Sequence, residues 1–431
     1  MNDAKLNSLT PHLLFGMFLL EVFFLFVKKI DGSLYGIFDT VEKLYPVIAI
    51  TMLAAFIKIK LNRNWWLALL FYIAYLAYGI LISLASQKGM KIILVQLYHE
   101  MKFFPMIFMF AMAKCDDLWA RRTLIIIKFI IIFSVLLILF QLAAPGTYDA
   151  FFKNGGHFEK GHIAGMLLPR LVGGFWHPSQ ISCFFLISSV FFIVQYGKGN
   201  IKFGLSMVLL CVMFVLVAIQ RFELMILFSV LMIIWIHRYT RNDYQPHLST
   251  FIFMLFSVLI LYVISDEAHF WTLLEEFKSP RNVFLVEALF TLVDSHYWGA
   301  GWGTIGSHAA ADVANVYEYN AMKDIWWVKM NQYFYDTYWP HVIGETGLPG
   351  FFLLLSSMTF MIRALKRPEA SILLFALILT SLLSSNVQSL YHLTIFGWFI
   401  MLLENTNDKA SSHPNSETSK SVLIKKTGDI L

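Results

Sequence analysis

The chain has 431 residues, of which 58% are hydrophobic and only 14% are charged. Soluble domains carry about 25% charged residues, and a mean hydropathy of +0.65 is more than one soluble core could bury. This composition excludes an ordinary soluble protein. The formal net charge of +5 does not indicate nucleic-acid binding, because Lys and Arg in the loops of membrane proteins produce such a charge.

The three cysteines show neither a disulfide framework nor a metal site. Cys183 and Cys211 lie in apolar runs, Cys115 lies in a short polar loop, and no CxxC spacing occurs. We therefore expect no disulfide framework and no zinc site, and the residues single out no other metal or cofactor. The first apolar run lacks a small-residue cleavage site after it, so we expect a retained helix and not a cleaved signal peptide.

The apolar residues fall in blocks of about 18 to 22, the length that crosses a hydrocarbon core of roughly 30 Å. Lipid offers the backbone no hydrogen-bond partners, so these blocks must be helical. We predict an all-α integral membrane protein whose membrane domain covers residues 1–404. The twelve predicted spans are 11–28, 44–58, 65–85, 92–113, 123–144, 179–197, 202–220, 222–237, 249–265, 342–362, 370–385 and 389–404.

Loop charges predict the orientation of these spans. Cationic residues are concentrated in the loops that lead from even-numbered to odd-numbered spans, and such loops face the cytoplasm. Examples are Lys58, Lys60 and Arg63, then Lys114, Arg121 and Arg122. Both termini are therefore expected in the cytoplasm, with residues 405–431 forming a disordered polar tail.

This orientation leaves two long extracytoplasmic loops, 145–178 and 266–341. The second is rich in Trp and Tyr, and loops of this length are uncommon unless they are functional. Its aromatic side chains would lie at the membrane interface or stack on sugar rings. A transporter built from two six-span halves would instead have its long loop in the middle of the chain and on the cytoplasmic side.

Ionisable residues near apolar runs are candidate functional groups, because charge at membrane depth costs several kcal/mol. Arg221 lies between two apolar helices with almost no loop, where it is a constrained cation, a snorkelling Arg or the partner of Glu223. Lys102 and His99 share a helix face at i, i+3, and Pro105 breaks the helix nearby. Lys102 could therefore line a cavity or pair with a neighbouring acid.

Two further segments carry chemistry in the second long loop. Arg281 follows Pro280 at the start of a helix-like run, where an Arg beside free backbone N–H groups can hold phosphate. Asp336, His341 and Glu345 precede or open the tenth span and are candidate bases. Cations and a base on the outer side suit a diphosphate leaving group and a hydroxyl acceptor. The residues alone thus indicate a membrane enzyme or transporter that handles an anionic, lipid-linked substrate.

Four segments resemble the bacterial O-antigen polymerase and O-antigen ligase superfamily. They occur in the family's order and on the expected side of the membrane, and the similarity covers roughly residues 95–400. The segments are Arg170 to Gln180, which is similar to R-x-x-G-x-F-x-x-P-[NS]; Gln220-Arg221; Pro280-Arg281 followed by Gly299 to Gly303; and Glu345 to Gly350, which is similar to E-x-G-x-x-G.

The resemblance implies a metal-independent, inverting membrane glycosyltransferase with a GT-C-like helical fold in the bacterial cytoplasmic membrane. The donor would be an oligosaccharide on undecaprenyl pyrophosphate, so the expected partners are this glycan and membrane lipid, with a chain-length regulator as a further candidate. By this resemblance Arg221 and Arg281, and less directly Lys102, would bind the pyrophosphate. Arg170, His177 and Glu345 would line the cavity.

One departure bears on the reaction. Ligases of this family have a His about nine residues before the Glu, and here that position is Asp336, whereas His341 is only four residues before Glu345. An Asp at this position favours a polysaccharide polymerase over a ligase and leaves the base open between Asp336 and His341. A ligase and a transporter of lipid-linked glycan are the alternatives.

Overall fold

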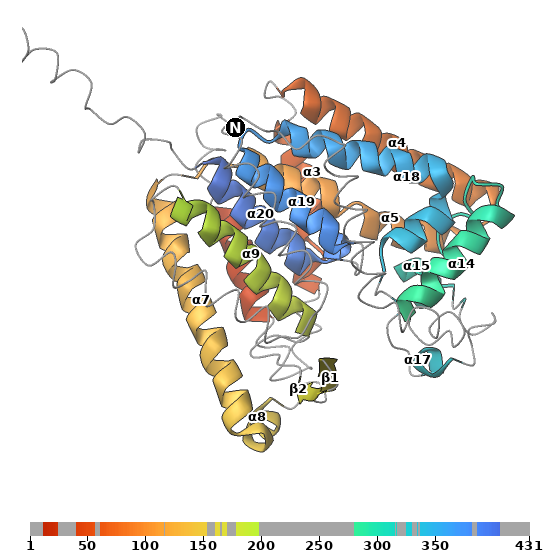
Figure 1. Cartoon of the computed structure of the whole chain (residues 1–431). Coiled ribbons are helices and arrows are strands. Elements are labelled where there is room, and N and C mark those ends of the chain that lie inside the picture. The colour runs from red at the N-terminus through yellow and green to blue at the C-terminus, as the bar shows by residue number, and fades with distance from the viewer. Residues whose placement is uncertain are drawn as a thin grey trace, which may run out of the picture.

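The computed structural model describes most of the helical part of the chain (Figure 1). The described residues are 12–24, 40–56, 61–115, 117–152, 160–163, 166–169, 178–197, 280–314, 316, 325–329, 334, 337–381 and 386–405. Predicted spans 202–220, 222–237 and 249–265, and the tail 405–431 apart from Asn405, lie outside them.

The described chain is predominantly helical. After a first helix, His12–Phe24, the elements are α3 (Tyr45–Phe56), α4 (Arg63–Ala85), α5 (Met90–Glu100), α6 (Phe103–Met112), α7 (Asp117–Ala143), α8 (Pro145–Phe151), β1 (Lys160–Ile163), β2 (Met166–Pro169), α9 (Pro178–Gly197), α14 (Pro280–Asp294), α15 (His308–Asp312), α17 (Trp326–Lys329), α18 (Trp339–Ala364), α19 (Pro368–Thr380), the 3₁₀ turn η2 (Asn386–Gln388) and α20 (Leu390–Glu404).

Nine of the predicted spans coincide with helices. Four helical stretches are long and apolar enough to cross a membrane, namely Arg63–Ala85, Met90–Met112, Arg122–Ala143 and Trp339–Ala364. They correspond to the predicted spans 65–85, 92–113, 123–144 and 342–362. The other five lie at shorter helices, including His12–Phe24 and Leu390–Glu404. A helical membrane protein is therefore confirmed, whereas the number of twelve spans stays a prediction.

The outward faces of α4 and α7 are apolar. On α7, Ile125, Phe129 and Leu136 are more than half exposed, and Leu70 and Leu81 of α4 are exposed to a similar degree. Soluble proteins rarely leave such continuous apolar surface in contact with water. These faces are the surfaces that hydrocarbon would cover.

The all-α prediction needs one small correction. Within the predicted loop 145–178, β1 and β2 pair antiparallel, with Lys160 opposite Pro169 and Ile163 opposite Met166. Backbone N–H and C=O groups outside helices still need partners, and a short strand pair supplies them locally. The other long loop is helical in part, because α14, α15 and α17 lie within it, and α14 packs against α18 (Figure 1).

Trp302 attaches the second loop to α4. Its side chain is 0% exposed, and its backbone N–H donates to Ser83 Oγ at 2.8 Å. Its indole ring lies against Gly79, where an added Cβ would overlap the ring. Trp302 therefore has a packing role, which differs from both the interfacial and the sugar-stacking role expected for the Trp residues of this loop.

We predict that Gly79→Ala destabilises the protein by about 1–3 kcal/mol, because the new methyl group overlaps a buried ring that has no room to move. Gly16→Ala is the matched control, since nothing lies within 4 Å of a Cβ at that helical glycine. Thermal unfolding of the detergent-solubilised protein measures both. Equal melting temperatures for the two variants would contradict the packing of Trp302 on Gly79.

Candidate active site

A break between α5 and α6 positions the central acid of the site. Pro105 lies in the first turn of α6, and a proline ring clashes with the carbonyl four residues earlier, here that of Met101. The helix is therefore kinked or broken near this point. The sequence predicted a break near Pro105, and the structure places it at Met101 and Lys102, so Glu100 ends α5.

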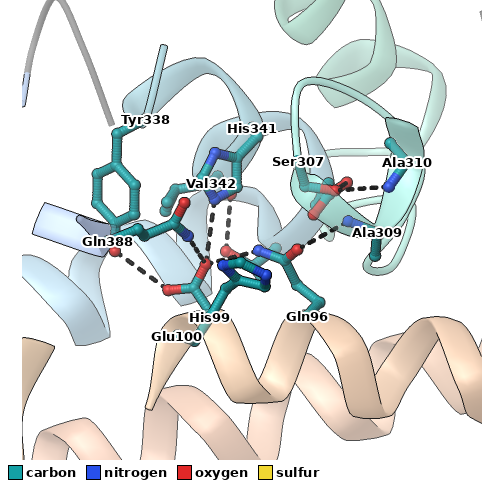
Figure 2. Close-up of polar contacts among 12 residues, drawn as sticks. Gln96, His99, Glu100, Ser307, Ala309, Ala310, Tyr338, His341, Val342 and Gln388 are labelled. Atoms are coloured by element: carbon teal, nitrogen blue, oxygen red, sulfur yellow. Dashed lines mark hydrogen bonds and ion pairs between the residues drawn. The ribbon is translucent and has the colours of Figure 1, made fainter. Parts of the chain in front are cut away.

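Glu100 is buried, with 2% of its surface exposed, and accepts hydrogen bonds from several elements (Figure 2). Its Oε1 accepts from Gln96 Nε2 at 2.8 Å and from Gln388 Nε2 at 2.8 Å. The same oxygen lies 3.1 Å from His341 Nε2, and Oε2 accepts from the Tyr338 hydroxyl at 3.1 Å. Donors on every side favour the ionised carboxylate.

His341 opens α18 and contacts Glu100 through one ring nitrogen. The side chain is buried, with 1% exposed. Because the ionised Glu100 carboxylate can only accept, His341 Nε2 must carry the hydrogen of that contact. Because Nε2 carries the hydrogen of the neutral ring, Nδ1 is the nitrogen able to take up a proton. The Thr337 carbonyl oxygen, 3.5 Å from Nδ1, can accept from Nδ1–H only once the ring is protonated.

Glu345 lies one turn further along α18 and anchors the second loop. Its Oε1 accepts from Thr304 N at 2.9 Å, from Ile305 N at 3.1 Å and from Ser307 Oγ at 2.7 Å. The side chain is 0% exposed, and its Oε2 has no hydrogen-bond partner among the described residues. Glu345 thus holds the loop beside His341, and neither its predicted cavity-lining role nor its role as a base is tested by these contacts.

The glycine-rich segment fits against an interruption of α18. Gly347 has a φ of 63° inside the helix, and Gly299 approaches it so closely that a Cβ would overlap the backbone of residues 345–347. Two loop amides use carbonyls freed there, with Ala300 N at 3.1 Å from Gly344 O and Gly301 N at 2.9 Å from Glu345 O. Gly299 in the loop and Gly347 in α18 therefore allow the loop backbone to pack directly against the backbone of α18.

His99, His308 and Lys102 form a group of basic side chains near Glu100. The imidazole rings of His99 and His308 stack with centroids 3.7 Å apart and planes 9° apart. Lys102 Nζ donates to His99 Nδ1 at 3.0 Å and lies 4.6 Å from the Tyr98 ring centroid. Because a lysine ammonium can only donate, His99 Nδ1 is the acceptor of this contact.

His308, which stacks on His99, also lies close to Asp312, whose side chain is about half exposed. Burial lowers the pKa of His308, although the neighbouring Asp312, 3.8 Å away, acts in the opposite direction. A backbone contact from the same short helix, Ala309 N to Gln96 Oε1 at 3.3 Å, ties α15 to α5 (Figure 2). The stack therefore contributes two imidazoles that are favoured in the neutral form.

The predicted site residues divide into three groups. His341, Lys102 and Glu345 lie within or directly beside the same buried cluster. Arg281 lies in the first turn of α14 next to Pro280, as expected, although its side chain is outside the described part. Arg170, His177, Arg221 and Asp336 lie outside the described residues.

The central residue of the cluster, Glu100, was not among the predicted site residues. Glu100 could have been recognised from the sequence, because an acid within the apolar span 92–113 is costly unless it has partners. The same criterion had already singled out its neighbours His99 and Lys102. Gln96 and Gln388 carried no comparable signal, since an uncharged amide is not unusual at either position. Gln96 lies four residues before Glu100 on the same helix, whereas the role of Gln388 depends on folding, which brings residues almost 300 positions apart into contact.

The fold and the cluster define a helical membrane protein with a buried carboxylate–imidazole pair covered by a long loop. Comparison with protein-family models and with curated proteins found no match to this chain.

We predict that Glu345→Ala releases the loop from α18, because three hydrogen bonds to one carboxylate oxygen are lost. Amide hydrogen exchange at Thr304 and Ile305 should accelerate by an amount that corresponds to roughly 1–3 kcal/mol. Glu345→Gln retains an accepting oxygen and should exchange nearly as slowly as the wild type.

Glu287→Ala, on α14 and outside this contact, is the matched control for removing an acid from the same region. Unchanged protection of residues 304 and 305 in Glu345→Ala would show that the carboxylate does not hold the loop.

Proposed function

We propose that the protein is a polysaccharide polymerase, which joins undecaprenyl-pyrophosphate-linked repeat units at the outer face of the bacterial cytoplasmic membrane. In this proposal the chain has twelve spans, a GT-C-like fold and cytoplasmic termini. The observation that carries it is the contact of His341 with Glu100, 3.1 Å apart, under a long loop at the start of a membrane helix. The resemblance of four sequence segments to the O-antigen polymerase family supports the same function.

The pair suits a general base for a sugar hydroxyl. The acceptor hydroxyl oxygen attacks the anomeric carbon of the growing chain, and the bond from that carbon to the pyrophosphate oxygen breaks. The electron pair leaves with the diphosphate, and the hydroxyl proton passes to His341 Nδ1. Glu100 fixes the hydrogen on Nε2 beforehand and stabilises the imidazolium formed. Asp336 is the alternative base.

Cations are needed where the diphosphate leaves. Arg221 and Arg281 are proposed to neutralise it, as the family resemblance implies. Lys102 is a further candidate, because its ammonium donates to a neutral imidazole at 3.0 Å within the same cluster. Arg281 lies on α14, which packs against the helix that carries His341. This packing supports placing a cation near the base.

The alternative enzyme, a ligase, would transfer a finished chain from the carrier lipid to a different acceptor. Gel analysis of cells without the protein separates the two activities. Loss of a polymerase leaves single repeat units attached to the acceptor, whereas loss of a ligase leaves long polymer on the carrier lipid. A transporter would give no product when the purified protein meets lipid-linked glycan in detergent.

We predict that His341→Asn lowers the rate of polymer formation by roughly 10²- to 10⁴-fold, the usual contribution of a general base. The measurement is the rate of chain extension by purified protein on lipid-linked repeat units. His296→Asn is the matched control, because His296 is exposed and has a φ of 53°, a conformation that Asn adopts readily.

A rate within a few-fold of the wild type for His341→Asn, together with a large loss for Asp336→Asn, would assign the base to Asp336. Wild-type rates in both variants would reject the proposed chemistry.

We predict that Arg221→Ala and Arg281→Ala each abolish long-chain polymer while the protein level in the membrane stays near normal. The physical reason is that each removes a cation from the departing diphosphate. Gels of chain length from cells that carry each variant as the only copy make the measurement, with Arg63→Ala, an exposed cation at the start of α4, as control. Long-chain polymer in both variants would reject the assignment.

A further inference from the structure

A second buried acid lies away from the Glu100 cluster, on the first helix, His12–Phe24. The buried face of this helix includes Met17, Phe18 and Glu21. Phe18 stacks on Trp398 of α20 with centroids 5.6 Å apart, and the Tyr45 hydroxyl of α3 donates to Met17 O at 3.5 Å. Glu21, one turn beyond Met17, is thereby enclosed by neighbouring helices.

Acidic groups surround this carboxyl. Glu21 is 2% exposed, and its Oε1 has no hydrogen-bond partner among the described residues. Glu42, just before α3, interacts electrostatically with Glu21. Glu21 in turn interacts electrostatically with Tyr45 on α3 and with Tyr391 on α20. Each of these groups is neutral or negative, so none of them would compensate a negative charge on Glu21.

An ionised carboxylate in such a place is costly. Charge at membrane depth costs several kcal/mol, and a nearby second acid adds repulsion. A buried acid without a compensating charge neutralises itself by taking up a proton. The neutral carboxylic acid also gains an O–H donor, which the ionised form lacks.

We propose that Glu21 is a proton-binding site within the membrane domain, separate from the Glu100–His341 pair. The bound species is a proton, held by the Glu21 carboxyl at neutral pH. This inference does not rest on the proposed polymerase activity.

The start of α3 offers a route for this proton. Glu42 is only partly buried and interacts electrostatically with Glu21, while the adjacent Lys43 interacts electrostatically with His99 of the first cluster. Glu42 is the group through which the proton would exchange with water.

Reaction with the hydrophobic reagent dicyclohexylcarbodiimide tests the proposal on the purified full chain. The reagent needs a protonated carboxyl: the acid proton passes to a carbodiimide nitrogen, the carboxyl oxygen bonds to the central carbon, and an acyl shift leaves a stable N-acylurea. Peptide mass spectrometry should find this adduct on Glu21 near pH 7, with a yield that falls as the pH rises. Glu21→Gln should lose the adduct from this peptide, and Glu42→Gln should keep it.

Sodium ions distinguish a proton from a metal cation. At fixed pH, a high concentration of Na⁺ should leave the yield on Glu21 unchanged. Protection by Na⁺ would overturn the proton site in favour of a cation site, and a yield independent of pH would overturn titration of the group.

If the reagent fails to reach the carboxyl, the pH dependence of the melting temperature tests whether Glu21 is protonated in the fold. A carboxyl that is protonated in the fold and ionised in the unfolded chain stabilises the fold at low pH, and this stability is lost as the pH rises. The wild type should therefore lose melting temperature relative to Glu21→Gln, which cannot titrate, as the pH rises above the ordinary carboxyl pKa of about 4.3. Parallel curves for the two proteins, with no adduct at any pH, would overturn the proposal.

Discussion

The buried carboxylate of Glu100 is the constraint on which the arrangement of the other elements depends. An ionised carboxylate loses several kcal/mol of hydration when it enters a low-dielectric interior, and only well-placed donors offset that loss. The donors come from α5 itself, from the start of α18 and from η2. Three parts of the chain are therefore held together at one oxygen atom, and removing one partner would leave a buried charge without its hydrogen bonds.

The second loop is held to this cluster by backbone as much as by side chains. Gly347 interrupts α18 and frees carbonyl groups that amides of residues 300 and 301 then use. Glu345, inside the same interruption, binds the next amides of the loop through its side chain. Leu348 N donates to Tyr297 O in place of Gly344 O, and Pro349 has no N–H to donate to Glu345 O, so both carbonyls are open to the amides of the loop beside His341.

Hydropathy was sufficient to predict most of the helices, because lipid imposes both a length and a backbone geometry on apolar segments. The bounds of α4 and α18 lie within three residues of the predicted spans. His341 and Lys102 were found from the cost of charge near apolar runs. Glu100 and Gln388 were not, because a hydrogen-bond network depends on which helices become neighbours, and one sequence without known contacts does not specify that. The role of Trp302 was missed for the same reason, since its partner, Gly79, is more than 200 positions away.

Three helical interruptions meet at the same place. The break at Met101 and Lys102 ends α5 at Glu100, α18 begins after Tyr338, and η2 occupies part of the gap between α19 and α20. Trp339 Nε1 donates to Ser381 Oγ at 3.0 Å, which ties the second of these points to the third. In a membrane, irregular backbone at depth is stable only where protein encloses it or where it lines a polar cavity. Convergence of all three on one carboxylate shows that the chain gives up regular helix to build a polar centre, a loss of stability that a purely structural bundle of apolar helices would have no reason to incur.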